Sequence, residues 1–389
     1  MSRRPVHPQL LTALCYAAMM ALSIGINLLP VYLTTISGVF GGAHGLTQEQ
    51  LGRLGASVFA GLVIGILITG PLADRLGAKL FTLVASALIA LALAAAALAR
   101  DYAALTVALF FLGAGSGIMD MVLSPIVAVL NPARRTAALN WLHSFYCVGA
   151  VVTILAGTLF IKAGVSWGGA CWLLLPLPAV LFALFLPLRF PALAAGGERA
   201  RLRTLLRKKW FVLALGAIFL GGATEAGMAQ WLPAYAETRL NFSLTVSGGA
   251  FLAFSLMMAL GRMLVGALGK CADEYSLMGW GCALSAALFL GGSFLPWPAA
   301  ALTACVLVGF TGSCLWPTTL AVCANRYPAG GASMFGLLAA LGNAGGIFMP
   351  WVVGWAADCA NLAWGLALSA LAPALMLPLL VLMRRPAAR

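Results

Sequence analysis

The chain has 389 residues, of which 62% are hydrophobic and 8% are charged, and its mean hydropathy is +1.01. Soluble domains carry about a quarter charged residues, so these side chains cannot form the polar surface that a soluble enzyme of this length needs. The formal charge of +13 does not indicate a nucleic-acid partner, because the basic residues lie between long apolar runs. The composition indicates a protein embedded in a lipid bilayer.

Turn and charge signals divide the chain into twelve apolar runs, each long enough for a membrane helix of about 20 residues. We therefore expect an all-α membrane protein. Seven basic residues lie between residues 189 and 209, after the sixth run. They predict an N-terminal six-helix bundle over 1–189, a cytoplasmic linker over 190–208 and a C-terminal bundle over 209–389. In chain order the expected spans are 10–34, 47–71, 79–99, 102–130, 137–163, 168–189, 209–236, 244–268, 276–296, 298–324, 332–357 and 361–383.

The basic residues alternate in a way that fixes the orientation of these spans. If both termini are cytoplasmic, the inner side holds 19 Lys and Arg residues and the outer side holds 4. Cytoplasmic loops are enriched in such residues, so both termini are expected inside. The excess of Arg over Lys is typical of bacteria with GC-rich genomes and favours the inner membrane. The nine cysteines have no ligand-like spacing and are interpreted as small buried hydrophobes, so we expect no metal and no cofactor.

The two halves of the chain repeat each other. The run 29–32 (LPVY) recurs as 232–235 (LPAY), 70–74 (GPLAD) recurs as 269–273 (GKCAD), and Gly113 matches Gly309. The offsets of 203, 199 and 196 keep one register. Internal repeats of this kind are typical of secondary transporters.

The loop expected after the second span, residues 70–79, reads GPLADRLGAK. It resembles the GxxxDRxGxK signature of the major facilitator superfamily, and twelve spans with a central basic linker fit that resemblance. The family fold implied is two pseudo-symmetric six-helix bundles. By resemblance this segment belongs to an inner gate, whereas the plainer alternative is that its charges only anchor a short loop. The gate residues would be Gly70, Asp74, Arg75, Gly77 and Lys79.

A narrower resemblance is to the fucose-permease-like sugar/proton symporters of the same superfamily. Asp120 is followed five positions later by Pro125, the segment 139–150 contains Leu-Asn and Gly-Ala pairs, and span seven carries a Gly, Glu, Trp, Tyr pattern. One departure is Asn27, which stands where that family has a further acidic residue. The drug-efflux branch has an arginine in span four and a glycine-rich run in span five, and neither is present here.

Three ionisable residues lie deep in apolar runs, where a charge costs about 2.5 to 3.5 kcal/mol. Asp120 has Ser116 and Ser124 one turn away on either side, so all three share a helix face that we expect to line a cavity. Asp120 is the predicted proton-coupling carboxylate, and a permanent structural partnership with His143 or with backbone donors is the alternative. His143 and Glu225 are the other predicted coupling groups.

Span five carries Asn140, His143 and Ser144 on one stripe, which suits hydrogen bonding to the hydroxyls of a polar solute. A packed interhelical histidine is the equal alternative. In span seven, Gln230 and Trp231 follow Glu225, and an aromatic ring beside polar groups is suited to a sugar. Tyr235, close to the outer end of this span, is expected in the interfacial aromatic belt.

Weaker candidates complete the expected site. Trp316, before Pro317 in span ten, and Asn343, in a glycine-rich stretch of span eleven, are predicted substrate contacts, and Asn27 is a predicted contact in span one. Pro317 and Pro350 are interpreted as kinks. Arg262 beside Gly261 is expected to snorkel to the inner surface or to act as a gate partner.

These residues predict a secondary transporter that moves a small polar solute, with a sugar as the first class, by alternating access coupled to protons. Sodium is the alternative coupling ion. Efflux of amphipathic compounds is a second transport hypothesis, and a non-transporting membrane sensor is the hypothesis from another class. The sequence has no Walker motif and no nucleophile elbow, so it is not expected to be an enzyme. The expected partners are the solute, the ion and lipid, with the chain as a monomer.

Overall fold

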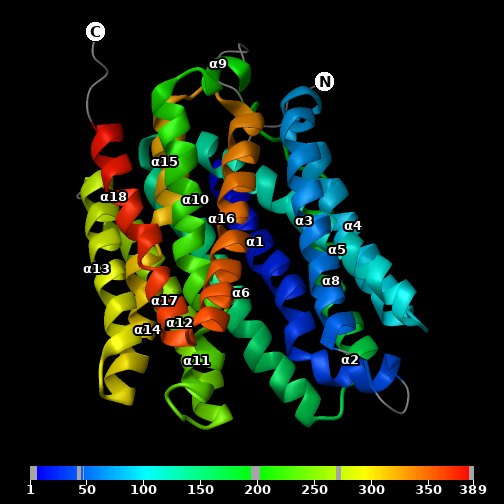
Figure 1. Cartoon of the computed structure of the whole chain (residues 1–389). Coiled ribbons are helices and arrows are strands. Elements are labelled where there is room, and N and C mark those ends of the chain that lie inside the picture. The colour runs from blue at the N-terminus through cyan, green and yellow to red at the C-terminus, as the bar shows by residue number, and fades with distance from the viewer. Residues whose placement is uncertain (1–6, 42–44, 47, 194–201, 269–272, 385–389) are drawn as a thin grey trace, which may run out of the picture. The chain divides into compact units, whose positions relative to one another are not determined.

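The structure is a computed structural model that describes residues 7–41, 45–46, 48–193, 202–268 and 273–384. Every regular element in these ranges is helical (Figure 1). In the first half the elements are α1 Pro8–Val31, α2 Leu33–Phe40, α3 Gln48–Leu76, α4 Ala78–Leu98, α5 Tyr102–Leu130, the 3₁₀ turn η2 Pro132–Arg134, α6 Arg135–Lys162, α7 Trp167–Leu174 and α8 Pro176–Phe185. In the second half they are α9 Leu202–Leu206, α10 Lys209–Ala229, α11 Leu232–Thr238, α12 Leu244–Leu268, α13 Glu274–Phe294, α14 Pro298–Gly312, α15 Leu315–Arg326, α16 Gly331–Cys359, α17 Leu362–Leu368 and α18 Leu371–Arg384.

Within the described residues, twelve helical segments are long and apolar enough to cross a membrane. This confirms the predicted all-α membrane fold. The second span differs most from the prediction, because α3 continues past Pro71 to Leu76. The expected loop over 70–79 is therefore wrong. Most of that segment is helical, and the chain turns at Gly77, whose φ of +89° is a conformation that favours glycine.

Prolines explain three of the breaks that divide a span into two helices. A proline has no N–H for the carbonyl four residues earlier, and its ring clashes with that carbonyl. The break between α10 and α11 begins after Ala229, four residues before Pro233. Ser313 lies between α14 and α15, four residues before Pro317, and the break before α8 directly precedes Pro176. The sequence therefore sets these breaks locally.

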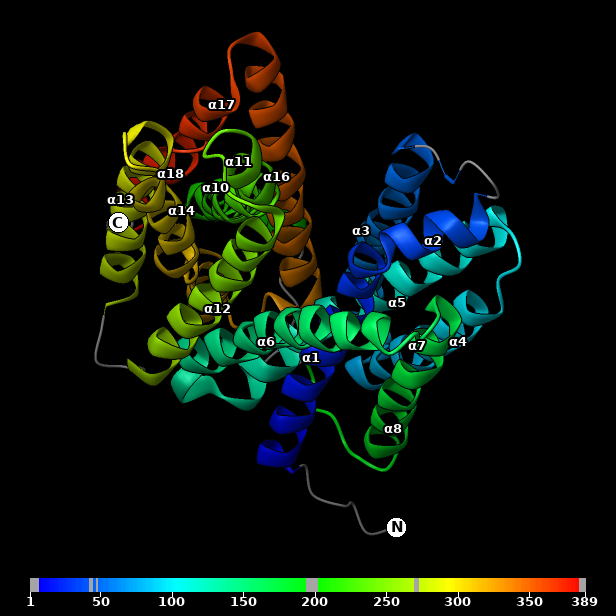
Figure 2. The same ribbon diagram turned by 90° about the horizontal axis from the view of Figure 1, so that it is seen from below.

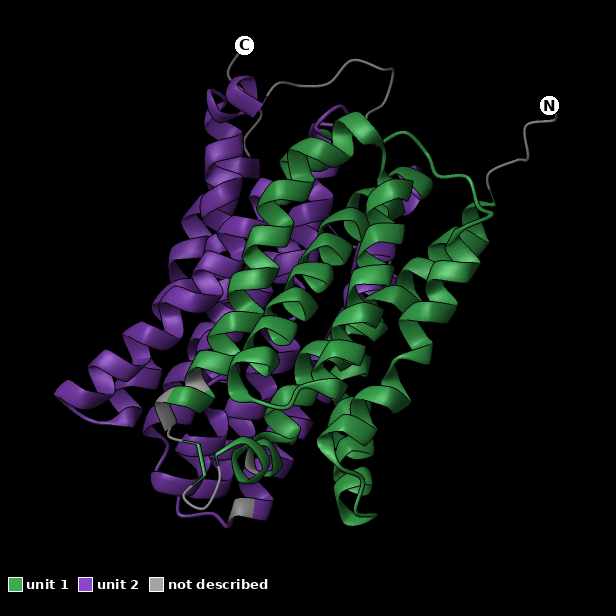
Figure 3. Cartoon of the chain, turned by 90° about the vertical axis from the view of Figure 1, so that its right-hand side faces the viewer, with its two compact units in different colours: residues 1–130, 145–198, 331–336 green, residues 131–144, 199–330, 337–389 purple. Residues whose placement is uncertain are grey.

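The chain divides into two compact units (Figure 3). Unit 1 comprises residues 1–130, 145–198 and 331–336, and unit 2 comprises 131–144, 199–330 and 337–389. In unit 1, α5 packs against α3 and α4, and α7 and α8 pack along α4 (Figure 2). In unit 2, α14 packs against α12 and α13, and α18 packs against α10 and α13. The exact bundle boundaries expected from the sequence stay a prediction.

The internal repeat is visible in equivalent helix crossings of the two units. A Cβ added at Gly113 would lie 1.9 Å from the Val58 carbonyl oxygen, and one added at Gly309 would lie 2.6 Å from the Phe254 carbonyl oxygen. Both pairs differ by the same offset of 196. Each glycine lets two helix backbones approach closely, so the α3–α5 contact of unit 1 is repeated as the α12–α14 contact of unit 2.

The equivalent tyrosines of the repeat are also both buried. The Tyr32 hydroxyl donates to the Val165 carbonyl at 3.4 Å, and the Tyr235 hydroxyl donates to the Gly292 carbonyl at 2.7 Å. Tyr235 is only 1% exposed, so the predicted place in an interfacial aromatic belt is wrong. Its hydroxyl needs a protein partner because it is shielded from the interface.

Candidate functional site

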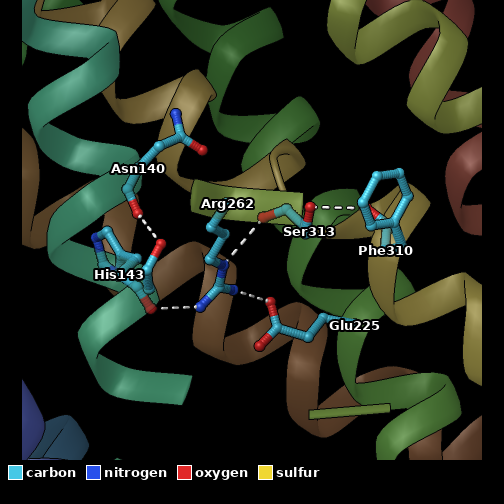
Figure 4. Close-up of polar contacts among 7 residues, drawn as sticks. Asn140, His143, Glu225, Arg262, Phe310 and Ser313 are labelled. Atoms are coloured by element: carbon cyan, nitrogen blue, oxygen red, sulfur yellow. Dashed lines mark hydrogen bonds and ion pairs between the residues drawn. The ribbon is translucent and has the colours of Figure 1, made fainter. Parts of the chain in front are cut away.

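The centre of unit 2 holds a buried ion pair. The Arg262 guanidinium on α12 donates to a carboxylate oxygen of Glu225 on α10 at 2.6 Å (Figure 4). Arg262 is 3% exposed and Glu225 is 25% exposed. Removing two charges from water is costly unless they are paired and hydrogen-bonded. The pairing therefore explains how both residues can lie inside spans.

Two main-chain carbonyls also accept hydrogen bonds from Arg262. Its Nε donates to the Ser313 carbonyl at 3.0 Å, and its Nη1 donates to the His143 carbonyl at 2.9 Å. The Ser313 carbonyl is the one that Pro317 leaves without a helical donor. The same proline that breaks span ten therefore supplies an acceptor for the guanidinium.

This geometry corrects one expectation from the sequence. Arg262 does not snorkel to the inner surface, because its side chain is buried and bonded to α10, α6 and the α14–α15 break. The alternative role as a gate partner stays a prediction. The sequence contained a usable signal, since an arginine within an apolar run needs a carboxylate and Glu225 also lay within one.

The polar stripe of α6 is divided by its hydrogen bonds. Asn140 is buried, and its Nδ2 donates to the Thr136 carbonyl at 2.9 Å and to the Thr318 hydroxyl at 3.1 Å, while its Oδ1 has no partner in the described structure. The Ser144 hydroxyl donates to the Asn140 carbonyl at 2.7 Å. His143 is 7% exposed. The Oδ1 atom of Asn140 can therefore accept a hydrogen bond from a solute, whereas the Ser144 hydroxyl already donates its proton to the protein.

Asp120 lies on α5 in unit 1, and it is partly exposed. Its neighbours on the expected polar face, Ser116 and Ser124, are buried, and the Ser116 hydroxyl donates back to the Leu112 carbonyl at 2.8 Å. Among the described residues no hydrogen bond or ion pair to the Asp120 carboxylate is found. Asn27 on α1 is also in unit 1, and its Nδ2 donates to Ser23, to the carbonyl at 2.8 Å and the hydroxyl at 3.2 Å.

The two candidates beside the α10–α11 break differ in their surroundings. Gln230 is exposed. The Trp231 indole N–H donates to the Pro350 carbonyl at 3.0 Å, and a Cβ on Gly354 would lie 3.1 Å from its ring. Trp231 also packs against a buried cluster that includes Met349. Its edge and part of its face are thus occupied by α16.

Trp316 and Asn343 lie close together in unit 2. A Cβ on Gly342 would lie 2.2 Å from the Trp316 ring, and one on Gly222 would lie 3.1 Å from it. These two glycines form the space that holds the indole. Asn343 follows Gly342 in α16, and its Nδ2 donates to the Ala339 carbonyl at 2.9 Å.

The predicted gate segment contacts the beginning of α16, and both parts belong to unit 1. The Asp74 carboxylate accepts the Ala332 N–H at 2.6 Å and the Ser333 N–H at 2.8 Å. A carboxylate at this position satisfies unpaired amides of the first turn and complements the helix dipole. Gly70 supports the contact, because its Cβ position lies 3.6 Å from the Gly336 Cα.

The other gate candidates have separate positions. Lys79 Nζ donates to the Leu186 carbonyl just after α8 at 2.7 Å. Arg75 is exposed in the last turn of α3. Gly77 makes the turn between α3 and α4. Asp74 and Gly70 are therefore the two members of the motif that contact α16.

A second contact of this kind was not predicted. The Thr136 hydroxyl near the start of α6 bonds to Glu274 at the start of α13, and Asn325 Nδ2 donates to the same carboxylate at 3.4 Å. Arg135 donates to the Ala324 carbonyl at 3.1 Å. The equivalent of Asp74 in the repeat is Asp273, which instead caps α13 by accepting the Ser276 N–H at 2.9 Å. The rest of the second motif copy, 269–272, lies outside the described residues.

Twelve candidate spans, an internal repeat and ionisable groups inside the helices are typical of multi-pass transporters. Residues 10–350 match the family model of the Major Facilitator Superfamily. The chain belongs to this family of transporters.

Comparisons with individual proteins agree on the family and differ in the cargo they name. The chain is 25% identical to an uncharacterized MFS-type transporter of Yersinia pestis over 330 residues, and this match covers 82% of each of the two chains. It is 29% identical over 315 residues, 75% of both chains, to a probable nitrate/nitrite transporter of Mycobacterium tuberculosis. The Escherichia coli fucose:proton symporter has the same fold, with a TM-score of 0.83, 18% identity and coverage of 96% of this chain and 98% of that one.

Proposed function

We propose that this chain is a proton-coupled secondary transporter that moves a small polar solute across a bacterial inner membrane by alternating access. The observation that carries the proposal is Asp120, a carboxylate within a span that has no bonding partner among the described residues. A carboxylate without a fixed cation is free to gain and lose a proton as its surroundings change. Such a group is what a carrier needs to link proton binding to solute binding.

Glu225 is the second proposed proton site. When its carboxylate is ionised, it neutralises Arg262 at 2.6 Å. Protonation removes this neutralisation and leaves a positive guanidinium that still donates to two carbonyls. Proton binding at Glu225 therefore changes the charge of the site by a full unit. That change shifts the population of conformers if the two conformers bind the proton and the solute with different affinities.

A sugar is the first class of solute to test. Asn140 presents an unpartnered amide oxygen, and Gln230 is exposed beside the α10–α11 break. These groups, with His143, Asn27 and Asn343, are suited to hydroxyl donors and acceptors. The narrower resemblance of the sequence to sugar/proton symporters supports the same choice. The proposed gate at Asp74 and Gly70 closes access through its bonds to the start of α16.

A small anion is the second candidate, and it is favoured by Arg262. A guanidinium is the side chain best suited to a planar carboxylate or nitrate, and protonation of Glu225 would remove the negative charge that Nη2 now contacts. The relative named as a nitrate/nitrite transporter supports this candidate. Under this proposal, a proton neutralises Glu225, and the transported anion takes the place of the Glu225 carboxylate beside Arg262.

The experiment is substrate-induced proton movement in proteoliposomes that contain a pH-sensitive dye, at fixed sodium. The panel contains hexoses, polyols, nitrate and monocarboxylates, and the variants are Asp120→Asn and the matched control Asp101→Asn. Asp101 lies outside the spans, and its side chain caps α5 by accepting the Ala104 N–H. An asparagine can accept the same hydrogen bond. A proton signal with one solute that disappears only in Asp120→Asn supports the proposal and identifies the solute.

Other results would change the assignment in defined ways. Accumulation that follows sodium rather than protons would replace the coupling ion. Outward movement of amphipathic compounds would favour efflux, and solute binding without flux would favour a sensor. Full uphill accumulation in Asp120→Asn would refute the coupling role of this carboxylate. Sedimentation of the purified chain tests the proposed monomer.

A further inference from the structure

Two membrane-spanning helices of unit 2, α13 and α18, lie side by side (Figure 1) and leave a groove of about 300 Å³ between them. This volume is at the lower end of the range of about 300 to 1,000 Å³ found for ligand sites. The groove is lined from α13 by Tyr275, Ser276, Gly279 and Trp280, and from α18 by Leu377, Leu380, Val381 and Arg384.

The walls of the groove carry exposed apolar side chains within two of the spans. Trp280 is 70% exposed and Val381 is 55% exposed, and both lie in spans. Gly279 keeps the floor open, because a Cβ added there would meet no atom within 4 Å. An apolar trough that is open along the membrane face fits an acyl chain.

A cation lies where the groove reaches the end of α18. Arg384 is 60% exposed, and one of its nitrogens pairs with Asp273 at 3.2 Å. A guanidinium has five N–H donors, and the described residues supply no further acceptor for Arg384. Asp273 itself accepts the Ser276 N–H and hydroxyl. Arg384 therefore retains donors that point to an additional anionic partner.

Other basic residues gather at the same end of unit 2. The Trp210 indole N–H donates to the Met383 carbonyl at 2.8 Å, and the Arg326 guanidinium lies 5.8 Å from the centre of its ring. The start of α10, the end of α15 and the end of α18 thus meet there. Lys208 and Lys209 precede Trp210 in the sequence. Each such cation near an anionic lipid surface contributes about 1 kcal/mol of attraction.

We propose that the groove between α13 and α18 binds an anionic phospholipid, with an acyl chain along Gly279 and Leu380 and the headgroup phosphate at Arg384. The lipid would join spans nine and twelve at the membrane surface. This site is separate from the ionisable groups proposed for transport, so it does not depend on which solute the protein carries.

The test uses the purified full-length chain in detergent, titrated with phosphatidylglycerol or with phosphatidylcholine of the same acyl chains. The melting temperature is followed by tryptophan fluorescence. Wild type should respond to phosphatidylglycerol at lower concentration than to phosphatidylcholine. Arg384→Gln should require about fivefold more phosphatidylglycerol, the equivalent of about 1 kcal/mol. Gly279→Leu, which fills the open floor, should lose the response to both lipids.

Matched controls separate this site from general attraction to lipid. Arg239→Gln removes an exposed charge at the end of α11 that does not line the groove, and Gly249→Leu fills open space at an exposed glycine of α12. Both should behave as wild type. If Gly279→Leu fails to fold, Val381→Trp fills the groove from the other wall. Equal responses to the two lipids, retention of the response in the filled variants, or an equal loss in Arg239→Gln would overturn the proposal.

Discussion

The buried pair of Glu225 and Arg262 gives the strongest test of the structure. Removing one member of a buried ion pair costs about 3 to 5 kcal/mol, because the other charge stays buried without compensation. Glu225→Leu removes the carboxylate that pairs with Arg262, which is 3% exposed. We expect a loss of about 3 kcal/mol. Arg262→Leu leaves a carboxylate that is 25% exposed and can take up a proton, so its electrostatic cost should be smaller.

The double variant separates pairing from packing. Replacing both charges by apolar residues of similar volume is often close to neutral, so the combined loss should fall below the sum of the single losses by about 1.5 to 3 kcal/mol. Unit 2 has about 200 residues, and for chains of that size 1 kcal/mol shifts the melting temperature by about 2 to 4 °C. The Glu225→Leu loss thus corresponds to roughly 6 to 12 °C.

A thiol-reactive dye provides the assay, because seven of the described cysteines are buried and become reactive on unfolding. Cys359 is exposed and gives the background signal. Melting curves of the two single variants and the double variant in one detergent complete the cycle. Additive shifts would refute a direct interaction between the two side chains, and so would a Glu225→Leu variant as stable as wild type.

Three further predictions follow from other contacts. Asp74→Ala removes the cap of α16 and should cost about 0.5 to 2 kcal/mol, measured by melting, with increased proteolysis near residue 331. Gly113→Ala should destabilise the chain, because the new Cβ would lie 1.9 Å from a carbonyl, whereas Gly55→Ala, with open space, should be neutral or stabilising by up to about 1 kcal/mol. The hydrogen bond from the Ser276 hydroxyl is the main reason that the pKa of Asp273 lies below its ordinary value of 3.8, and the charge of Arg384 lowers this pKa by a smaller amount. This contribution to stability is complete at neutral pH and is lost as the pH falls through the folded-state value. Ser276→Ala should therefore flatten the melting-temperature profile below about pH 4.

The spans could be predicted because each depends on local composition. A run of about 20 apolar residues specifies a membrane helix wherever it lies. Pro176, Pro233 and Pro317 lie at breaks between helices, whereas Pro71 and Pro350 lie inside continuous helices. The boundary near Gly77 was less accessible, because the second span was expected to end at residue 71 and residues 70–79 were expected to form a loop. In the structure α3 continues through Pro71, since a membrane helix can tolerate a proline when other groups satisfy the freed carbonyl.

The candidate site was predicted residue by residue, but its connections were not. The sequence marked Glu225 and Arg262 as costly inside a span, yet it did not show that they form a pair across 37 positions. It marked Asn140 as polar without showing that Thr318 would take one of its donors. Such partners depend on which helices pack together, and no local pattern encodes that choice. Buried charges are the useful exception, because their cost requires a partner.

The repeat explains both what the two halves share and where they differ. The crossings at Gly113 and Gly309 are equivalent, since close backbone contact needs only a small residue at the same offset. The acidic positions diverge: Asp74 caps α16, whereas its equivalent, Asp273, caps its own helix and the neighbouring Glu274 bonds to the start of α6. In the first repeat, Asp74 contacts the start of a helix of the second repeat. In the second repeat, the residue after its equivalent, Glu274, makes the corresponding contact with a helix of the first. The glycines at the helix crossings cannot move in this way. If a glycine were displaced by one residue, a larger side chain would lie between the two helices.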